Sequence, residues 1–175
     1  MTQHGKVNIG STIMFGNYDW RVLDINGDKA LVITQNIIEE RAYNVKWDDV
    51  TWETCSLRSY LNGVFYDSFI EEDKAKIIEI KVRNERNPHY QTNCGNDTND
   101  KIFLLNIQEA EILFKNDEER EATFDDEVGS WWLRSTGEVG TAAAFVASGD
   151  IRGDGFLVND DSMGLRPVLW LNLYC

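Results

Sequence analysis

Cysteine, histidine and proline are scarce in this sequence, and each shortage narrows the classes of protein that it can encode. Its 175 residues include three cysteines, two histidines and two prolines. Cys55, Cys94 and Cys175 form no C-x-x-C pair, so the sequence predicts neither a zinc knuckle nor a thioredoxin-type site. Their odd number and wide spacing do not suggest a disulfide framework, and reduced thiols, as in the cytoplasm, are the default expectation.

Long apolar runs and clusters of basic residues are also missing. No apolar stretch approaches the ~18 residues that a membrane-spanning helix needs, and Met1 to Gly10 lacks the apolar core of a secretory signal. The formal net charge is -13, which repels nucleic-acid phosphates and anionic membrane surfaces. We therefore expect no nucleic-acid partner, no membrane partner and a cytoplasmic location by default, with display on a phage or a cell surface as the alternative.

The chain does have enough apolar material for a core. It is 42% hydrophobic, with six Trp, six Tyr and eight Phe, and Trp131, Trp132 and Trp170 are predicted to build part of that core. No internal repeat or domain boundary is visible. We predict one α+β domain over residues 1–175, with a β-meander and helices in 11–115, an acidic loop in 116–128 and a C-terminal display segment in 130–175.

The N-terminal third reads as antiparallel strands. Ser11 to Phe15 is a short strand, and Tyr18 to Ile25 pairs with Lys29 to Thr34. The Asn26-Gly27 dipeptide between the last two is a strong hairpin signal, because both residues tolerate the positive φ of a type I′ turn. The sequence therefore predicts a β-hairpin that turns at Asn26-Gly27.

Short helices and a long loop are predicted to follow. A helix over Trp52 to Leu61 is expected to be capped by Thr51 and ended by Asn62-Gly63. A second short helix passes through Phe65, Tyr66 and Phe69, and Ser68-x-x-Glu71 is read as a capping box for a third over Glu72 to Ile78. The next predicted elements are an extended segment Glu79 to Val82, a polar loop Asn84 to Asp100, a strand Ile102 to Leu105 and a helix opened by the capping box Asn106-x-x-Glu109. Residues Asn116 to Glu127 read as a solvated acidic loop.

The C-terminal part changes character. Trp131 to Leu133 and Thr141 to Ala147 read as buried strands, and Arg166 to Leu173 as a closing strand. Turn clusters are predicted at Ser148-Gly149-Asp150 and Gly153-Asp154-Gly155. Short strands with glycine-rich, polar tips are typical of loops that a rigid base presents to a ligand.

The sequence gives weak support to catalysis or metal binding. His89 and Cys94 lie five residues apart in the polar loop, and they are the basis of an alternative hypothesis, an enzyme that uses loop 84–100. Asp150 to Asp161 resembles a calcium loop, but Arg152 occupies a position that needs an oxygen ligand. We predict no cofactor and no metal; whether loop 84–100 binds calcium stays open.

Two aromatic residues stand out in the display segment. If Ala144 and Val146 point inward, strand alternation turns Phe145 outward, where it could contact a ligand together with Phe156. An equally favoured interpretation packs Phe145 under a neighbouring loop.

Five motifs occur together in the order Gly16 to Leu23, Thr51 to Asn62, Asn96 to Leu105, Trp131-Trp132-Leu133-Arg134-Ser135 and Gly164-Leu165-Arg166-Pro167 to Leu171. This combination resembles a widespread bacterial family of uncharacterised domains, common in gut bacteria and phage. Its closing motifs are similar to the C-type lectin-like fold of the variable proteins of diversity-generating retroelements, and more distantly to the formylglycine-generating enzymes. The cysteine pair of those enzymes has no counterpart here, so that likeness implies a fold alone.

The resemblance to the variable proteins implies a non-enzymatic domain whose residues 136–163 present side chains to a protein or glycan ligand. It also implies structural roles for Arg134 and Arg166, in pairs with carboxylates. A scaffold module of a larger bacterial or phage assembly is a further alternative, and the oligomeric state is left open. The implied display positions are Glu138, Thr141, Phe145, Ser148, Asp150, Arg152, Asp154, Phe156, Asn159 and Asp160.

Overall fold

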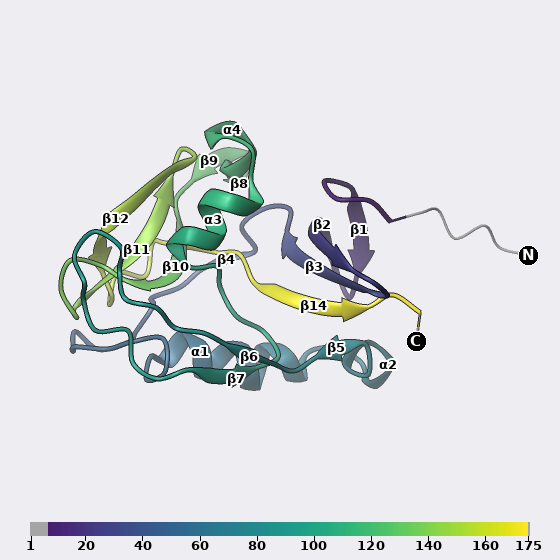
Figure 1. Ribbon diagram of the computed structural model, residues 1–175, viewed down its shortest axis with the longest axis horizontal. Coiled ribbons are helices and arrows are strands. Elements are labelled where there is room, and N and C mark those ends of the chain that lie inside the picture. Colours follow the sequence, from purple (N-terminus) through teal and green to yellow (C-terminus); the bar gives the residue numbers. More distant parts are fainter. Residues whose placement is uncertain (1–6, 175) are drawn as a thin grey trace, which may run out of the picture.

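Two five-stranded sheets dominate residues 7–174, the part of the chain that the computed structural model describes (Figure 1). Sheet 1 lies near the chain ends and all its neighbouring strands are antiparallel. Its strand order is β1 (Thr12–Phe15), β2 (Tyr18–Asn26), β3 (Lys29–Thr34), β14 (Val168–Asn172) and β5 (Ile77–Ile78). The last strand of the chain therefore lies between two strands from its first half.

Sheet 2 contains most of the predicted display segment. Its order is β12 (Asp150–Leu157), β11 (Ala142–Ala147), β10 (Trp131–Thr136), β13 (Gly164–Leu165) and β4 (Glu39–Glu40). The β10–β13 pair is parallel and the other neighbours are antiparallel. Two small antiparallel pairs complete the strands, β6 (Ile80–Val82) with β7 (Thr98–Asp100) and β8 (Ala122–Phe124) with β9 (Glu127–Gly129).

The helices are short and lie around the two sheets. They are α1 (Ser56–Tyr60), the π-helix η1 (Leu61–Phe65), α2 (Glu71–Lys74), α3 (Ile107–Leu113) and α4 (Asp117–Arg120). In Figure 1, α1, η1 and α2 run along one side of the molecule, and α3 and α4 lie on the opposite side. Within residues 7–174, no helix has the length and apolar character needed to cross a membrane. The observed mixture of antiparallel sheets and short helices confirms the α+β class.

The predicted N-terminal hairpin is present, but its turn is displaced by one residue. Asn26 pairs with Lys29, so Gly27 and Asp28 form the two-residue turn, with Gly27 at φ 62°. An irregularity between Val22 and Asp24 shifts the register of β2 against β3. Because β2 contains one extra residue at this bulge, the turn falls one residue later in the sequence than predicted.

The predicted end of the first helix at Asn62-Gly63 is wrong. The helical path continues through these residues as η1, and Gly63 has no positive φ. The Asn62 side chain instead donates to the carbonyl of Ile102 at 2.8 Å and accepts from the N–H of Lys101 at 2.8 Å. Because Asn62 makes these long-range bonds, it holds α1 and η1 against the central segment rather than ending the helix.

The start of this helix also differs from the prediction. Thr51 forms a turn with Thr54, and the residue that precedes α1 is Cys55, whose side chain makes no cap bond. The proposed capping box at Ser68 is absent, since the Ser68 hydroxyl donates to the Phe65 carbonyl. Helix α2 is accordingly only Glu71–Lys74, and Ile77–Ile78 join β14 as an edge strand, where strand pairing outweighs helix propensity.

The capping box at Asn106 is confirmed. The Asn106 side chain accepts from the Glu109 N–H at 2.7 Å, and the Glu109 carboxylate accepts from the Asn106 N–H at 2.9 Å. The segment before it, residues 102–105, is buried as expected, but it forms only a bridge between Phe103 and Val168 instead of a full strand. Its backbone carbonyls can therefore accept hydrogen bonds from side chains elsewhere in the chain.

The segment Asn116 to Glu127 is not a solvated loop. It folds into α4, which Asn116 caps, and the β8–β9 hairpin. The reason is Arg120, which is buried and donates to the Gly149 carbonyl at 2.7 Å and to Asp117. A single cation therefore attaches the acidic segment to the turn of the β11–β12 hairpin.

The core is rich in tryptophan. Trp20, Trp52, Trp131 and Trp132 are among the largest fully buried side chains, which confirms the predicted role of the paired tryptophans. Trp170 is only partly buried and packs at the edge of the core, so its predicted core role is correct in part.

Substitution of Gly149 tests the contact between this hairpin turn and α4. A Cβ on Gly149, at φ 80°, would lie 2.1 Å from the Asp117 carbonyl oxygen, whereas a Cβ on Gly27, at φ 62°, meets nothing within 4 Å. We expect Gly27→Ala to cost about 1 kcal/mol of unfolding free energy from backbone conformation alone. Gly149→Ala should cost at least about 2 kcal/mol in urea denaturation, because it adds a clash with backbone. Equal losses of unfolding free energy in the two variants would show that the turn does not pack against α4 in this way.

Candidate functional site

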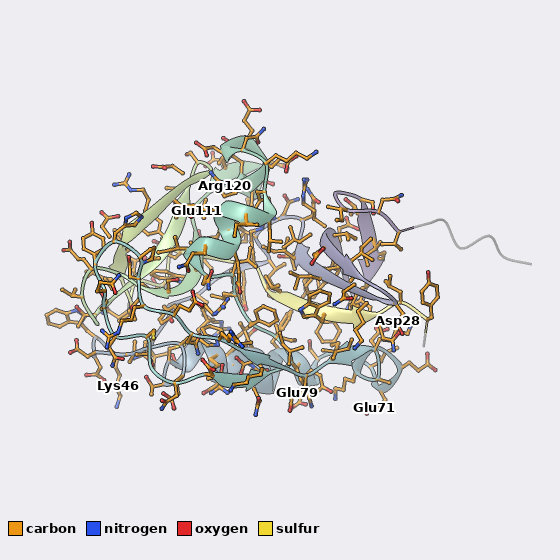
Figure 2. All side chains as sticks on the ribbon, in the orientation of Figure 1. Asp28, Lys46, Glu71, Glu79, Glu111 and Arg120 are labelled. Carbon is orange, nitrogen blue, oxygen red and sulfur yellow. The ribbon has the colours of Figure 1, made fainter. Side chains whose placement is uncertain are left out.

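Loops from four parts of the chain gather at one end of the molecule, opposite the end where β1 and β14 lie (Figure 1). We call this the loop end; it comprises residues 41–50, 84–97, 137–141 and 158–163. Backbone bonds join them, from the Asn44 N–H to the Val158 carbonyl at 2.8 Å and from the Val50 N–H to the Gly140 carbonyl at 3.0 Å. Figure 2 shows Lys46 at this end and Asp28 at the other.

Arg134 in β10 anchors the loop end from beneath. Its guanidinium donates to the carbonyls of Leu104 and Arg83, at 2.8 and 2.9 Å, and forms a two-pronged pair with Glu109. Its side chain is only 2% exposed. The predicted pairing of Arg134 with a carboxylate is therefore confirmed.

The long loop 84–97 is attached directly to the display segment. The buried Asn87 side chain donates to the carbonyls of Thr136 and Gly153, at 2.8 and 2.7 Å. The Thr92 hydroxyl donates to the Gly137 carbonyl at 2.7 Å, and the Thr136 hydroxyl donates to the Asn93 carbonyl at 3.1 Å. A loop without regular structure is thus fixed by side-chain bonds to β10 and β12.

The β11–β12 hairpin forms the outer edge of sheet 2. Ser148 and Gly149 make its turn, as predicted, but Gly153-Asp154-Gly155 lies inside β12 and is not a turn. The register moves from Ala143 opposite Phe156 to Phe145 opposite Arg152, so β12 carries extra residues here. Gly155 takes φ 88° in this irregular stretch, which explains why glycines that suggested a turn occur within a strand.

An aromatic patch lies on one face of this hairpin; we define it as Phe145, Arg152, Asp154 and Phe156. The rings of Phe145 and Phe156 meet edge to face with centroids 5.9 Å apart. Phe145 is half-buried against the core and Phe156 is 43% exposed, while Ala144 and Val146 are fully buried as expected. Arg152 and Asp154 form an ion pair at 3.7 Å beside the rings.

The other predicted display positions do not converge on this patch. Ser148 and Asp150 lie at the hairpin turn next to α4, whereas Glu138 and Thr141 lie at the opposite end of the hairpin, with Asn159 and Asp160 beyond β12. None of the ten predicted residues is buried. The structure therefore places them along the whole length of the hairpin, and only the patch residues form a compact group.

A polar cleft opens at the loop end, with a volume of about 370 Å³. The carboxylates of Asp49 and Glu53 lie on its walls, and Glu53 accepts from the Asn96 N–H at 2.9 Å. Bonds from the backbone and side chain of Asn96 hold the pKa of Glu53 below its ordinary value. The remaining lining residues are Val50, Thr51, Thr54, Thr92, Asn93, Gly95 and Gly140.

Sequence analysis missed this cleft because its walls come from three separate segments. It also missed Trp47, which is 65% exposed in the loop at 41–50, next to Val45 at 73%. The available signal was local, since Trp47 sits among the charged residues Lys46, Asp48 and Asp49. An aromatic ring in such a run points to the surface rather than the core.

Cys94 and His89, the pair on which the enzyme hypothesis depends, have different neighbours in the structure. The Cys94 thiol donates to the carbonyls of Asn84 at 3.1 Å and Gly95 at 3.5 Å, and His89 lies beside Gly153 of β12. Cys55 is buried, which raises the pKa of its thiol to about 12. Among residues 7–174, no group of three or more His, Cys, Asp or Glu side chains is arranged to hold a metal ion.

The oxygen-rich stretch at 96–100 uses its carboxylates within the protein. Asp97 accepts from the Asn84 N–H and pairs with Lys81 at 3.3 Å. Asp100 is buried and accepts from the Trp52 indole at 2.8 Å and from Arg58 at 2.7 Å. These carboxylates support loop 84–97 and its attachment to α1.

The prediction that Arg166 pairs with a carboxylate is wrong. Its fully buried guanidinium donates to the carbonyls of Thr34, Gln35 and Arg120, and stacks over Trp131 at 4.7 Å. Burial without a counter-ion lowers the pKa of Arg166 to about 9. Two nearby cations do have carboxylate partners in α4, Arg120 with Asp117 and Arg21 with Glu119.

Comparison with protein families gives one match, to the Domain of unknown function (DUF6273), over residues 27–173. The chain belongs to this family. The match begins at the hairpin turn of sheet 1 and includes all four segments of the loop end, the aromatic patch and the polar cleft. No curated protein and no solved structure matches the chain.

Asn87→Ala tests whether loop 84–97 is held by its side-chain bonds. The substitution removes the donor to the carbonyls of Thr136 and Gly153 and the acceptor of the His89 N–H, so we expect a loss of about 2–3 kcal/mol in unfolding free energy. Amide hydrogen exchange should accelerate in residues 88–96. Asn36→Ala, at an exposed asparagine, is the matched control and should change stability by less than about 0.5 kcal/mol. Unchanged exchange in the loop would contradict this role of Asn87.

The pH response of the cleft follows from Glu53. Because its folded-state pKa is lowered, its stabilising bond to Asn96 is present above the ordinary pKa and is lost as the pH falls through the folded value. The Asn96 amide resonance should titrate with a midpoint below about 4.3, the ordinary value for glutamate. Glu53→Gln should abolish this titration and Glu72→Gln should not. A midpoint at or above the ordinary value would count against the bond.

Proposed function

We propose that this chain is a non-enzymatic ligand-binding domain of C-type lectin-like fold, which recognises a protein or a glycan through residues 136–163. The aromatic patch is the centre of the contact surface, and the polar cleft and Trp47 extend it across the loop end. The remaining display positions are surface sites whose side chains can vary without a change in the core. This is the property that a retroelement-diversified variable protein requires.

The arrangement of the sheets supports the lectin-like fold. The first and last strands, β1 and β14, belong to the same sheet, which lies on one side of the molecule (Figure 1). The long loops lie at the opposite end and are fixed by bonds to β10 and β12. A rigid base with loops on the far side is suited to binding, because little ordering is needed when the ligand arrives.

The observation that carries the proposal is the ring pair of Phe145 and Phe156. Half-buried Phe145 fixes the orientation of the exposed Phe156 ring, at a centroid distance of 5.9 Å. Exposed rings next to a charged pair are suited to stacking on a sugar face or to filling a pocket in a protein. Arg152 and Asp154 add a donor and an acceptor at the border of the rings.

Phe156→Ala tests this proposal, with Tyr174→Ala as the matched control, because Tyr174 is an exposed aromatic residue at the other end of the molecule. On a printed array of bacterial and host glycans, we expect Phe156→Ala to weaken binding at least about tenfold, as for a contact worth about 1.4 kcal/mol or more. Tyr174→Ala should bind like the unmodified chain. Retained binding by the double variant Phe145→Ala, Arg152→Ala would refute the placement of the site.

A second measurement distinguishes the two ligand classes. If no glycan binds, a photo-reactive benzoyl-phenylalanine at position 156 should cross-link a protein ligand, and the same group at position 174 should not. Equal cross-linking at both positions, or none at position 156, would contradict recognition through the aromatic patch.

A further inference from the structure

A second concave surface is lined by residues of α3, of β6 and of strands β3 and β14 in sheet 1. Its volume is about 380 Å³, within the range of pockets for small molecules, which is roughly 300–1,000 Å³. None of the ten predicted display positions lines it. We call it the α3 groove.

The walls of the α3 groove are mainly apolar. Trp170 of β14, only partly buried, and Leu31 of β3 contribute from sheet 1, and Ile80 and Val82 contribute from β6. Phe103 lies between these two sides, and Ile112 and Leu113 of α3 complete the wall, with Ile112 80% exposed. Ile80, Leu113 and Trp170 are partly exposed beside the exposed Ile112, and partly uncovered apolar side chains around a cavity point to an apolar ligand.

Three charged residues stand on the border of the groove, and two of them are already neutralised. Lys81 pairs with Asp97 at 3.3 Å. Glu109 uses its carboxylate for Arg134 and for the Asn106 N–H. Arg83 is exposed, and its guanidinium makes no direct hydrogen bond or ion pair to any residue in 7–174, although its charge acts on the nearby carboxylate of Asp97.

The net charge of the chain is -13. Repulsion by the surrounding carboxylates disfavours anions over most of the surface, so one unpaired arginine beside an apolar cavity selects for a ligand with both characters. A guanidinium binds a carboxylate or sulfonate through two parallel bonds, which fixes the ligand's orientation as well as its charge.

We propose that the α3 groove binds a small amphipathic acid, with its apolar body against Trp170, Ile112 and Leu113 and its anionic group on Arg83. The size of the groove suits a short fatty acid or an aromatic acid rather than a folded partner. This site is separate from the aromatic patch, and it does not depend on the function proposed for the loop end.

Anilinonaphthalene sulfonate, which combines an apolar ring system with one anionic group, is the probe for this site. We expect its fluorescence to rise on addition to the folded protein, and Arg83→Gln to weaken its binding about fivefold to tenfold, as for one exposed charged contact. Ile112→Asp, which places a like charge beside the ligand, should weaken it by at least about tenfold. Circular dichroism checks that each variant is folded.

Two matched variants serve as controls. Lys29→Gln removes one positive charge from an exposed residue outside the groove, and Ile70→Asp adds one negative charge at an isoleucine that is 63% exposed directly before α2. Both should bind the dye like the unmodified chain. If Arg83→Gln and Lys29→Gln weaken binding equally, general charge explains the effect and the assignment of Arg83 is overturned.

Displacement by natural acid classes completes the test. Octanoate should displace the dye at a concentration at least about tenfold lower than octanol, because only octanoate can pair with Arg83. Equal displacement by the two molecules, or no displacement by octanoate, would overturn recognition of an acid. Loss of glycan or protein binding at the loop end would leave this result unchanged, so the two proposals fail independently.

Discussion

The guanidinium of Arg134 is the point where the elements that support the loop end meet. It bonds the end of β6, the segment before α3 and the carboxylate that caps α3, while its own backbone carbonyl accepts from the Tyr43 hydroxyl at 2.8 Å. Removal of this cation would break all of its hydrogen bonds together. Each buried acceptor left without a donor lowers the free energy of unfolding. The position of loop 84–97 over the display segment follows from this one side chain and from Asn87.

Buried arginines replace part of the apolar core in this fold. Arg120, Arg134 and Arg166 are all buried, and each donates to a backbone carbonyl outside the helices and strands, those of Gly149, Leu104 and Gln35. A domain with short strands and long loops has many carbonyls outside sheet or helix bonding, and these must find donors. The long, multidentate guanidinium satisfies several at once, which is how irregular segments become rigid enough to support a binding surface.

Local patterns predicted part of this structure, and contacts between distant residues decided the rest. The N-terminal hairpin, the Asn106 capping box and the buried Trp131–Trp132 strand depend on neighbouring residues, so the sequence alone indicated them. The predictions for Asn62 and for the acidic segment were wrong because side chains there bind distant partners. Asn62 bonds to the Ile102 carbonyl, and Arg120 of the acidic segment bonds to the Gly149 carbonyl.

The same reason limits the prediction of sites. The exposure of Phe156 could be anticipated from composition and turn signals, because a glycine-rich polar segment rarely packs into a core. The α3 groove and the polar cleft could not be anticipated, since their walls combine segments spread over residues 31–170 and 49–140, respectively. Only the pairing of strands and loops brings them together.

The central place of β14 in sheet 1 has a consequence for biosynthesis. Its neighbours β3 and β5 are translated early, yet they have no strand between them until Val168–Asn172 leaves the ribosome. Until that moment the hairpin of β2 and β3 presents an open edge of Leu31, Val32 and Ile33, a run that can pair with another nascent chain. The edge of β3 therefore stays unpaired while residues 35–167 are synthesised, and it must be shielded for that time.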